Sequence, residues 1–298
     1  MTKIKISIIT AITIIFSLTL IGCSSSPEKV LSDALTKNKG ITYSKQDTDI
    51  SIGLAGMGVD IKAKGEIDSK SQKSSMKVSA KSPLLQGKDI SIDIYSDKNI
   101  IYVKDPESDQ YLKMNSNNGE KSITEIGSTM ASGLASVLKD DTKVKESLKL
   151  KNGDNSDKVV SAEISGETVT KLIDKAIASQ SVFTAMESAV ESQLISMAET
   201  QGVGSVNKEE IQKSAKEEAK KAVEEYKTLI KNLKFQNVKY TGKINKDGYL
   251  YGEELSFNVS EASSGMTLNI KIITKLSDIN SGKSVNIPSI PADKITNL

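Results

Sequence analysis

Few residue types in this chain could do covalent or acid–base chemistry. The 298 residues contain one cysteine, Cys23, and no histidine, and every basic residue is a lysine. Without histidine, a Ser-His-Asp triad and a zinc site built on imidazole are excluded. Without arginine there is no bidentate guanidinium clamp for phosphate or carboxylate. Carboxylates, lysines, hydroxyls and tyrosines are what remains for catalysis.

Adjacent acidic residues are the first candidates for acid chemistry. Neighbouring side chains point to opposite faces of a strand and diverge on a helix, so such a pair does not converge on one substrate. The spacing around Asp140 also lacks the pattern of a calcium-binding loop. We therefore predict no catalytic residues, no cofactor and no metal site, and we predict that the protein is not an enzyme. The pairs are Asp140-Asp141, Glu209-Glu210 and Glu253-Glu254.

Cys23 directly follows an apolar segment. Lys3 and Lys5 give the chain a positive start, and residues 6–22 carry no charge. A basic start, an apolar run and small residues at the cut are typical of a secretory signal. The run is shorter than the roughly 20 residues that span a membrane. We predict that residues 1–22 are a signal peptide.

The residues Leu20, Ile21, Gly22 and Cys23 resemble the lipobox of bacterial lipoproteins. The resemblance implies a diacylglycerol on the Cys23 thiol and cleavage just before this residue. Two acyl chains give stable anchoring, whereas one chain holds only marginally. The implied location is the outer face of the cell membrane, outside the cytoplasm, with residues 23–29 as the lipidated tether. The competing interpretation is a core cysteine that happens to follow an apolar stretch.

Charge argues against a nucleic-acid partner. The whole chain has a formal net charge of +2, and Lys3 and Lys5 of the signal peptide account for it. Basic and acidic side chains balance in the rest of the chain, whereas binding to nucleic acid requires a clear basic excess.

Most of the remaining sequence alternates between apolar and polar residues. Strict alternation predicts strands that are buried on one face only, as in antiparallel sheets. A short amphipathic helix beginning at Pro27 and ending near Gly40 precedes them. Turn residues separate the strands, including Lys246-Asp247-Gly248, which predicts a hairpin. The predicted strands are residues 48–54, 57–63, 76–80, 90–94, 100–103, 111–114, 159–165, 235–244, 249–259 and 266–272.

Helical spacing dominates the middle of the chain. Apolar residues at intervals of three and four predict helices over residues 123–138, 169–200 and 207–233. The last of these is rich in Lys and Glu, which indicates a solvated face more often than a docking surface. The tail at residues 285–291 contains two prolines, which favour an edge or a wrapping segment. The strands at the two ends of the chain are expected to share one sheet, with the helices over it.

This arrangement resembles the LolA/LppX/LprG-like lipoprotein superfamily, of the Gram-positive type. The similarity runs from residues 27–35 through the strands to Ile287-Pro288. It implies an α+β fold in which a curved antiparallel sheet, a half-barrel, is covered by helices. We expect one such domain over residues 30–298, with a long two-helix insertion at residues 167–233 that departs from the family pattern.

The resemblance also implies a function. Several members of the superfamily carry lipids on an apolar concave face, so the first hypothesis is a membrane-anchored binder or carrier of lipid or another apolar ligand. The alternative is a non-catalytic structural or interaction lipoprotein of the cell envelope, in which the same face is filled by the protein's own helices. The sequence specifies no protein partner. The predicted ligand face consists of Ile50, Ile52, Val59, Ile61, Ile92, Ile94, Phe257, Leu268 and Ile270.

Overall fold

The computed structural model describes most of the chain after the predicted signal peptide. The described residues are 26–54, 57–81, 83, 89–98, 100–115, 142–178, 184, 187, 190–191, 194–195, 208–261 and 266–297. The signal peptide, the lipobox with Cys23, and the predicted helix at residues 123–138 lie outside them. Among the described residues, no helix is both long enough and apolar enough to cross a membrane.

The chain forms two compact units. The helical unit comprises Met1–Thr19, Asn118–Asp141 and Glu167–Lys234, and the sheet unit comprises Leu20–Asn117, Thr142–Gly166 and Phe235–Leu298. The predicted insertion at residues 167–233 coincides closely with the last segment of the helical unit. Its described helices are α5 (Gly166–Ala178) and α7 (Lys208–Lys231). That residues 30–298 form a single domain stays a prediction.

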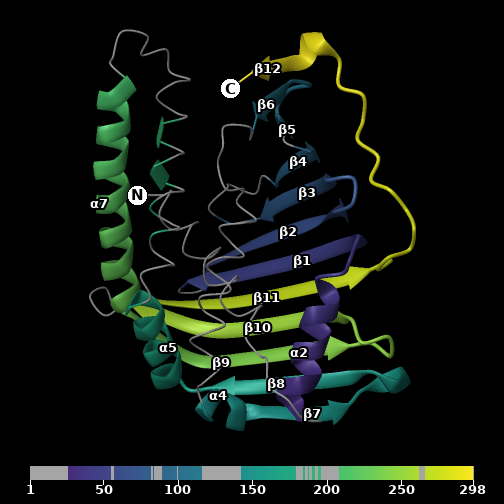
Figure 1. Ribbon diagram of the computed structural model, residues 1–298, viewed down its shortest axis with the longest axis vertical. Coiled ribbons are helices and arrows are strands. Elements are labelled where there is room, and N and C mark those ends of the chain that lie inside the picture. The colour runs from purple at the N-terminus through teal and green to yellow at the C-terminus, as the bar shows by residue number, and fades with distance from the viewer. Residues whose placement is uncertain are drawn as a thin grey trace. The chain divides into compact units, whose positions relative to one another are not determined.

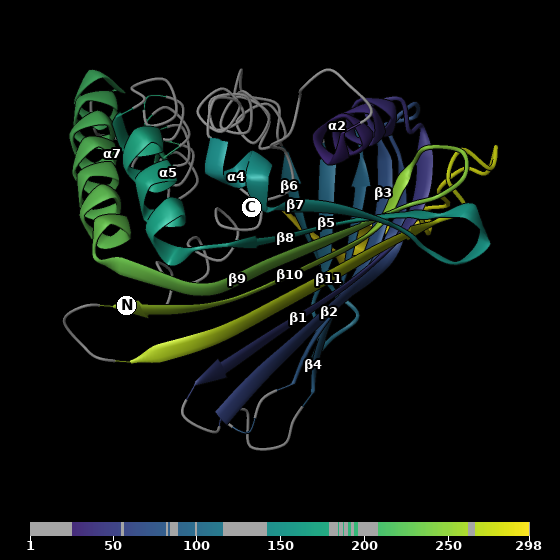
Figure 2. The ribbon, with the colours of Figure 1, turned by 90° about the horizontal axis from the view of Figure 1, so that it is seen from below.

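The sheet unit is built on a curved sheet of twelve strands (Figures 1 and 2). The strand order is linear, β12-β6-β5-β4-β3-β2-β1-β11-β10-β9-β8-β7, with β12 and β7 at its two edges. The predicted α+β fold with a curved, largely antiparallel sheet is confirmed. The strands are β1 (Tyr43–Leu54), β2 (Met57–Asp68), β3 (Lys73–Lys81), β4 (Ile90–Asp97), β5 (Ile100–Lys104), β6 (Tyr111–Asn115), β7 (Leu148–Asn152), β8 (Lys158–Ile164), β9 (Leu233–Ile244), β10 (Leu250–Glu261), β11 (Thr267–Ser277) and β12 (Ile295–Asn297).

Strands from the N-terminal and C-terminal parts of the chain pair near the middle of this sheet. Strand β1 pairs antiparallel with β11, so that Ile50 lies opposite Ile272 and Ile52 opposite Ile270. The expectation that N-terminal and C-terminal strands share one sheet is therefore confirmed. The predicted hairpin turn joins β9 to β10, where Gly248 has a φ of +81°, a conformation that glycine adopts without steric cost.

Helix α2 (Pro27–Asn38) fixes the start of the described chain on the sheet. Ser26 caps the helix by accepting a hydrogen bond from the Lys29 N–H, and Pro27 occupies its first turn. At the other end, the Asn38 side chain donates to the Leu250 carbonyl and accepts from the Leu250 N–H. Helix α2 contacts β7, β8 and β10, and α4 (Thr142–Ser147) lies on the same side of the sheet (Figure 2).

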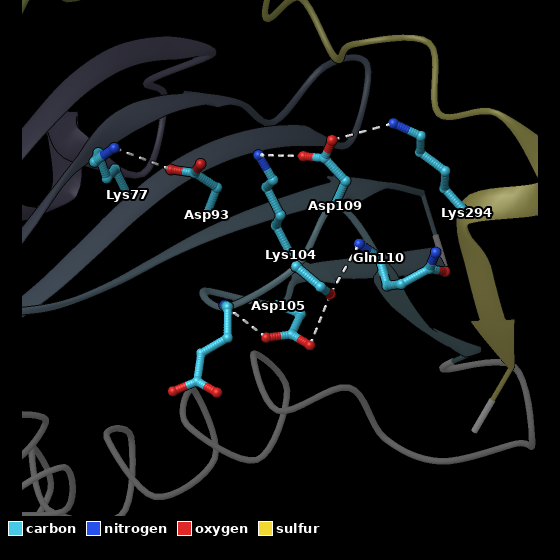
Figure 3. A network of polar contacts seen from close by, with 9 residues as sticks. Lys77, Asp93, Lys104, Asp105, Asp109, Gln110 and Lys294 are labelled. Atoms are coloured by element: carbon cyan, nitrogen blue, oxygen red, sulfur yellow. Dashed lines mark hydrogen bonds and ion pairs between the residues drawn. The ribbon is translucent and has the colours of Figure 1, made fainter.

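The C-terminal segment ends in the one parallel pair among the described strands. Residues after β11 run without regular strand structure along the side of the sheet to β12, which pairs parallel with β6 (Figure 1). Asp109 lies between Lys104, at 3.6 Å, and Lys294, at 3.4 Å, and so ties this segment to the β5–β6 hairpin (Figure 3). The two lysines hold the pKa of the Asp109 carboxyl below its usual value, Lys294 more strongly.

Candidate functional site

The strand registers bring all nine residues of the predicted ligand face to one side of the sheet. Residues directly opposite each other in an antiparallel pair point to the same face. Such directly opposite residues follow one another across six neighbouring strands, in the order β10, β11, β1, β2, β3 and β4. We call this side the apolar face. It comprises Leu255, Phe257, Val259, Leu268, Ile270, Ile272, Ile50, Ile52, Val59, Ile61, Ala63, Met76, Val78, Ala80, Ile92 and Ile94.

The opposite side, the polar face, is held by ion pairs across the strands. Lys64 lies 2.7 Å from Asp47, and Lys271 lies 2.8 Å from Glu254. The alternate residues of each strand thus separate into an apolar and a charged surface, as the period of two requires. Because these pairs are solvent-exposed, each contributes at most about 1 kcal/mol to stability.

Burial divides the apolar face into two parts. On β10 and β11, Phe257 is 2% exposed and Ile270 is 3% exposed. On β1, β2 and β4 the six predicted residues are only half-buried, and so is Leu268 at the start of β11. At the margin of the face, Ile90 is 39% exposed. The first part is packed like a protein core, and the second presents aliphatic side chains that are incompletely buried.

Aromatic and aliphatic packing accounts for the buried part. The rings of Phe235 and Phe257 lie with their centroids 6.0 Å apart and tilted by 43°, a favourable arrangement for aromatic pairs. On the neighbouring strands, Val160 is fully buried and Val238 is 1% exposed. Burial of such side chains contributes roughly 1.5–3 kcal/mol each, so this part stabilises the sheet.

One polar row interrupts the apolar face. Glu253 on β10 lies opposite Thr274 on β11, and Thr274 lies opposite Thr48 on β1. The Tyr240 hydroxyl donates to Glu253 Oε1 at 3.0 Å, and the hydroxyls of Thr48 and Thr274 are 3.3 Å apart. This row was not predicted from the sequence, where Glu253 is conspicuous only as half of the adjacent acidic pair Glu253-Glu254. Counting back in steps of two from Val259 places Glu253 on the apolar face.

The environment of Glu253 alters its protonation. Burial raises the pKa of the Glu253 carboxyl to about 7, and the hydrogen bond from Tyr240 opposes this only in part. Burial, together with the nearby Glu253, also raises the pKa of the Tyr240 hydroxyl well above its usual value. A carboxyl of this kind is uncharged in mildly acidic solution and becomes charged near neutrality.

The raised pKa predicts a specific pH dependence of stability. Because the folded-state pKa exceeds the unfolded value of 4.5, stability is lost as the pH rises from about 4.5 through 7. Glu253→Gln removes the charge and keeps an acceptor for Tyr240. We expect it to raise the free energy of unfolding by about 2 kcal/mol at pH 8, after allowing for partial exposure of the side chain, and by much less at pH 5.

Urea denaturation of both proteins across pH 4–9 measures this difference. Glu254→Gln is the matched control, because Glu254 is the next residue in the chain, is exposed and pairs with Lys271 on the polar face. We expect Glu254→Gln to change the free energy of unfolding by no more than about 0.5 kcal/mol at any pH in this range. Parallel stability curves for the parent and Glu253→Gln would contradict the account of this carboxyl.

Two pockets lie on the polar face. One, of about 560 Å³, is lined by residues that include Ser51, Asn237, Asn258 and Asn269. Its two lysines already have acidic partners, Glu163 for Lys239 and Glu254 for Lys271.

The other pocket, of about 460 Å³, is lined mainly by charged side chains of β4, β5 and the following turn (Figure 3). Within it, Lys77 lies 3.6 Å from Asp93. Asp105 accepts hydrogen bonds from the Glu107 N–H and the Ser108 hydroxyl. This pocket is strongly polar, whereas the lining of the first pocket also includes Phe257 and Ile270 of the predicted ligand face.

Sequence comparison places the chain in a family. The model of a family of unknown function, DUF6612, matches residues 26–200 and 197–293. The chain belongs to the DUF6612 family. A comparison with curated proteins found no match. The family match covers the described α-helices and every strand of the sheet except β12. Most of each compact unit of this DUF6612 protein therefore lies within the family match.

Comparison with solved structures found several similar chains, of which three are described. The lipoprotein LppX of Mycobacterium tuberculosis is 12% identical with a TM-score of 0.35, over 87% of this chain and 96% of its own. LprF from Mycobacterium bovis is 13% identical with a TM-score of 0.33, over 90% and 99%. A DUF1329 family protein from Desulfovibrio piger is 8% identical with a TM-score of 0.24, over 87% and 96%. The chain is thus similar to LppX and LprF, as the resemblance predicted, but TM-scores below 0.5 carry no inference about what it binds.

Proposed function

We propose that this DUF6612 protein is a lipoprotein, anchored to the outer face of the cell membrane by diacylglycerol on Cys23, that binds lipid or another apolar ligand and catalyses no reaction. The observation that carries the ligand proposal is the incomplete burial of the apolar face on β1, β2 and β4. Contiguous apolar side chains that water reaches in part are typical of a binding surface.

The anchoring proposal rests on the sequence around Cys23 and on helix α2. The lipobox resemblance supplies the attachment point, and α2 follows it within four residues. Because Asn38 bonds both backbone groups of Leu250, the helix is fixed to the sheet. An anchor at Cys23 would therefore hold the sheet unit close to the membrane surface, where lipid is available.

A structural lipoprotein of the cell envelope is the second candidate. The observation that favours it is the burial of Phe257 and Ile270, which shows that part of the apolar face is a filled core. If the half-buried part is likewise filled in solution, the face stabilises the fold and binds nothing. The two candidates therefore differ in one property, the presence of a bound apolar molecule.

Native mass spectrometry tests the proposal. The mature chain, residues 23–298 with Cys23→Ser, is purified from a bacterial host without detergent, so that any lipid present is bound to the protein fold. We expect a population heavier than the protein by the mass of a lipid, which organic extraction removes. A single species at the mass of the bare chain, unchanged after incubation with a lipid extract, would favour the envelope scaffold.

A further inference from the structure

Within the paired strand registers, the apolar face carries a single ionisable carboxyl. Along the paired registers of β10, β11, β1, β2, β3 and β4, the residues on this face are aliphatic, aromatic or small polar ones, with Glu253 as the exception. These registers place no lysine on the face. The lysines nearest to Glu253 along them, Lys275 and Lys271, belong to the polar face, where Lys275 lies opposite Gly252 and Lys271 opposite Ser256.

The surroundings of Glu253 leave part of its hydrogen-bonding capacity unused. Among the described residues, its hydrogen-bond partner is the Tyr240 hydroxyl, which occupies one position on Oε1. A carboxyl group offers about four acceptor positions on its two oxygens. Thr274 lies opposite it, and beyond Thr274 the row continues with Thr48, to which Gln46 donates at 3.1 Å. The row is therefore a line of hydroxyls and one carboxyl within an apolar surface.

The position of this row suits the polar end of an amphiphile. On one side of it, Leu255, Ile272 and Ile50 form the next row, and Phe257, Ile270 and Ile52 form the row after that. Leu255, Ile272, Phe257 and Ile270 are buried, whereas Ile50 and Ile52 at the β1 ends of these rows are half-buried. An acyl chain lying against Ile50 and Ile52 would bring its polar end toward Thr274 and Glu253. A negatively charged end would meet a carboxyl that has no lysine beside it within the paired registers of this face, a juxtaposition that costs several kcal/mol.

We infer that the ligand is an acyl-chain amphiphile whose polar end donates hydrogen bonds and carries no negative charge, and that Glu253, to which Tyr240 already donates one hydrogen bond, accepts those hydrogen bonds. This inference rests on the proposed function and defines its ligand class. Glu253 selects against phosphate-bearing lipids, and the apolar rows supply most of the affinity. The contribution of a hydrogen bond to a charged group, about 1.5–3 kcal/mol, is sufficient for selection between otherwise identical lipids.

Two lipids that differ only by a phosphate group test this selection. They are 1-monooleoylglycerol and 1-oleoylglycerol 3-phosphate, which share the acyl chain and glycerol. Equilibrium dialysis of each radiolabelled lipid at pH 8, below its critical micelle concentration, gives a Kd for the mature chain carrying Cys23→Ser. The same measurement is made with Glu253→Gln, with Glu254→Gln as the matched control on the polar face, and with Thr274→Val.

The parent chain should bind monooleoylglycerol at least about tenfold more tightly than its phosphate, which corresponds to ~1.4 kcal/mol. Glu254→Gln and Thr274→Val keep the carboxyl and should preserve the preference. Glu253→Gln should reduce it to within about threefold, mainly through tighter binding of the phosphate lipid. Unfolding midpoints of the variants show whether each is folded.

The outcomes separate this inference from the proposed function. If the parent binds both lipids equally, or if Glu253→Gln keeps the full preference, the role of Glu253 is overturned while apolar binding stands. If neither lipid binds to the folded parent, both the inference and the proposed function are overturned.

Discussion

Replacing Cys23 with serine abolishes incorporation of labelled palmitate into the protein and blocks cleavage of the signal peptide. A serine hydroxyl does not form the thioether that holds diacylglycerol, and the lipoprotein signal peptidase requires the lipidated cysteine. The apolar residues 6–22 therefore stay attached to the serine variant, which is larger than the processed parent. Metabolic labelling and gel electrophoresis of cells that express each protein measure both effects, and each effect should be close to complete.

A neighbouring hydroxyl residue supplies the control for this experiment. Ser24→Ala changes the tether beside the lipidation site and should leave labelling, processing and membrane retention unchanged. If Cys23→Ser is still labelled to the parent level, or is still cleaved before residue 23, the lipoprotein interpretation of residues 20–23 is wrong.

Ile270→Ala destabilises the protein by roughly 2–5 kcal/mol, whereas Ile92→Ala costs about 1 kcal/mol. The two substitutions remove the same atoms from the same face of the sheet, and they differ in burial. Ile270 is 3% exposed, opposite Phe257 and Ile52, so truncation leaves an unfilled cavity. Ile92 is half-buried, opposite Val78, so fewer protein contacts are lost.

Urea denaturation gives the stability of each variant, and the amount of bound lipid is measured on the same preparations. Ile92→Ala should lower lipid retention, while Ile270→Ala should act mainly on the unfolding midpoint. A loss for Ile92→Ala as large as that for Ile270→Ala, with no lipid in the parent, would indicate a filled face and favour the envelope scaffold.

The alternation of residues was sufficient to predict the faces of the sheet. Ile50, Ile52 and Ile270 were assigned to one side from their spacing alone, and the register of β1 with β11 places them opposite one another. Alternation works here because side chains along a strand point to the two faces in turn. The β9–β10 hairpin was equally accessible, since Gly248 adopts a positive φ that other residues rarely take.

The short elements at the sheet edges could not be predicted in the same way. Strand β7 and the preceding helix α4 span five and six residues, too few to show a period. Strand β12 has three residues, and its parallel pairing with β6 depends on the long segment that precedes it and on the contact between Asp109 and Lys294. These features arise from tertiary contacts that local patterns do not encode.

The site was predictable in its apolar part and not in its polar part. Which side chains share the face follows from spacing, but the difference in burial between Phe257 and Ile92 depends on packing that no local pattern contains. The raised pKa of Glu253 likewise results from burial, which is a property of the folded chain. The alternation of β10 places Glu253 on the apolar face. As half of the adjacent pair Glu253-Glu254, however, it has the appearance of an ordinary surface carboxylate.

Site-specific photocrosslinking tests most directly whether the apolar face binds lipid. A benzophenone side chain is introduced at position 92 or, in a second protein, at position 93, where Asp93 belongs to the polar face and pairs with Lys77. Each protein is illuminated with radiolabelled monooleoylglycerol. A covalent lipid adduct at position 92 and none at position 93 is the predicted result. Equal labelling at the two positions, or no adduct at position 92, would contradict the proposal that this face binds an apolar ligand.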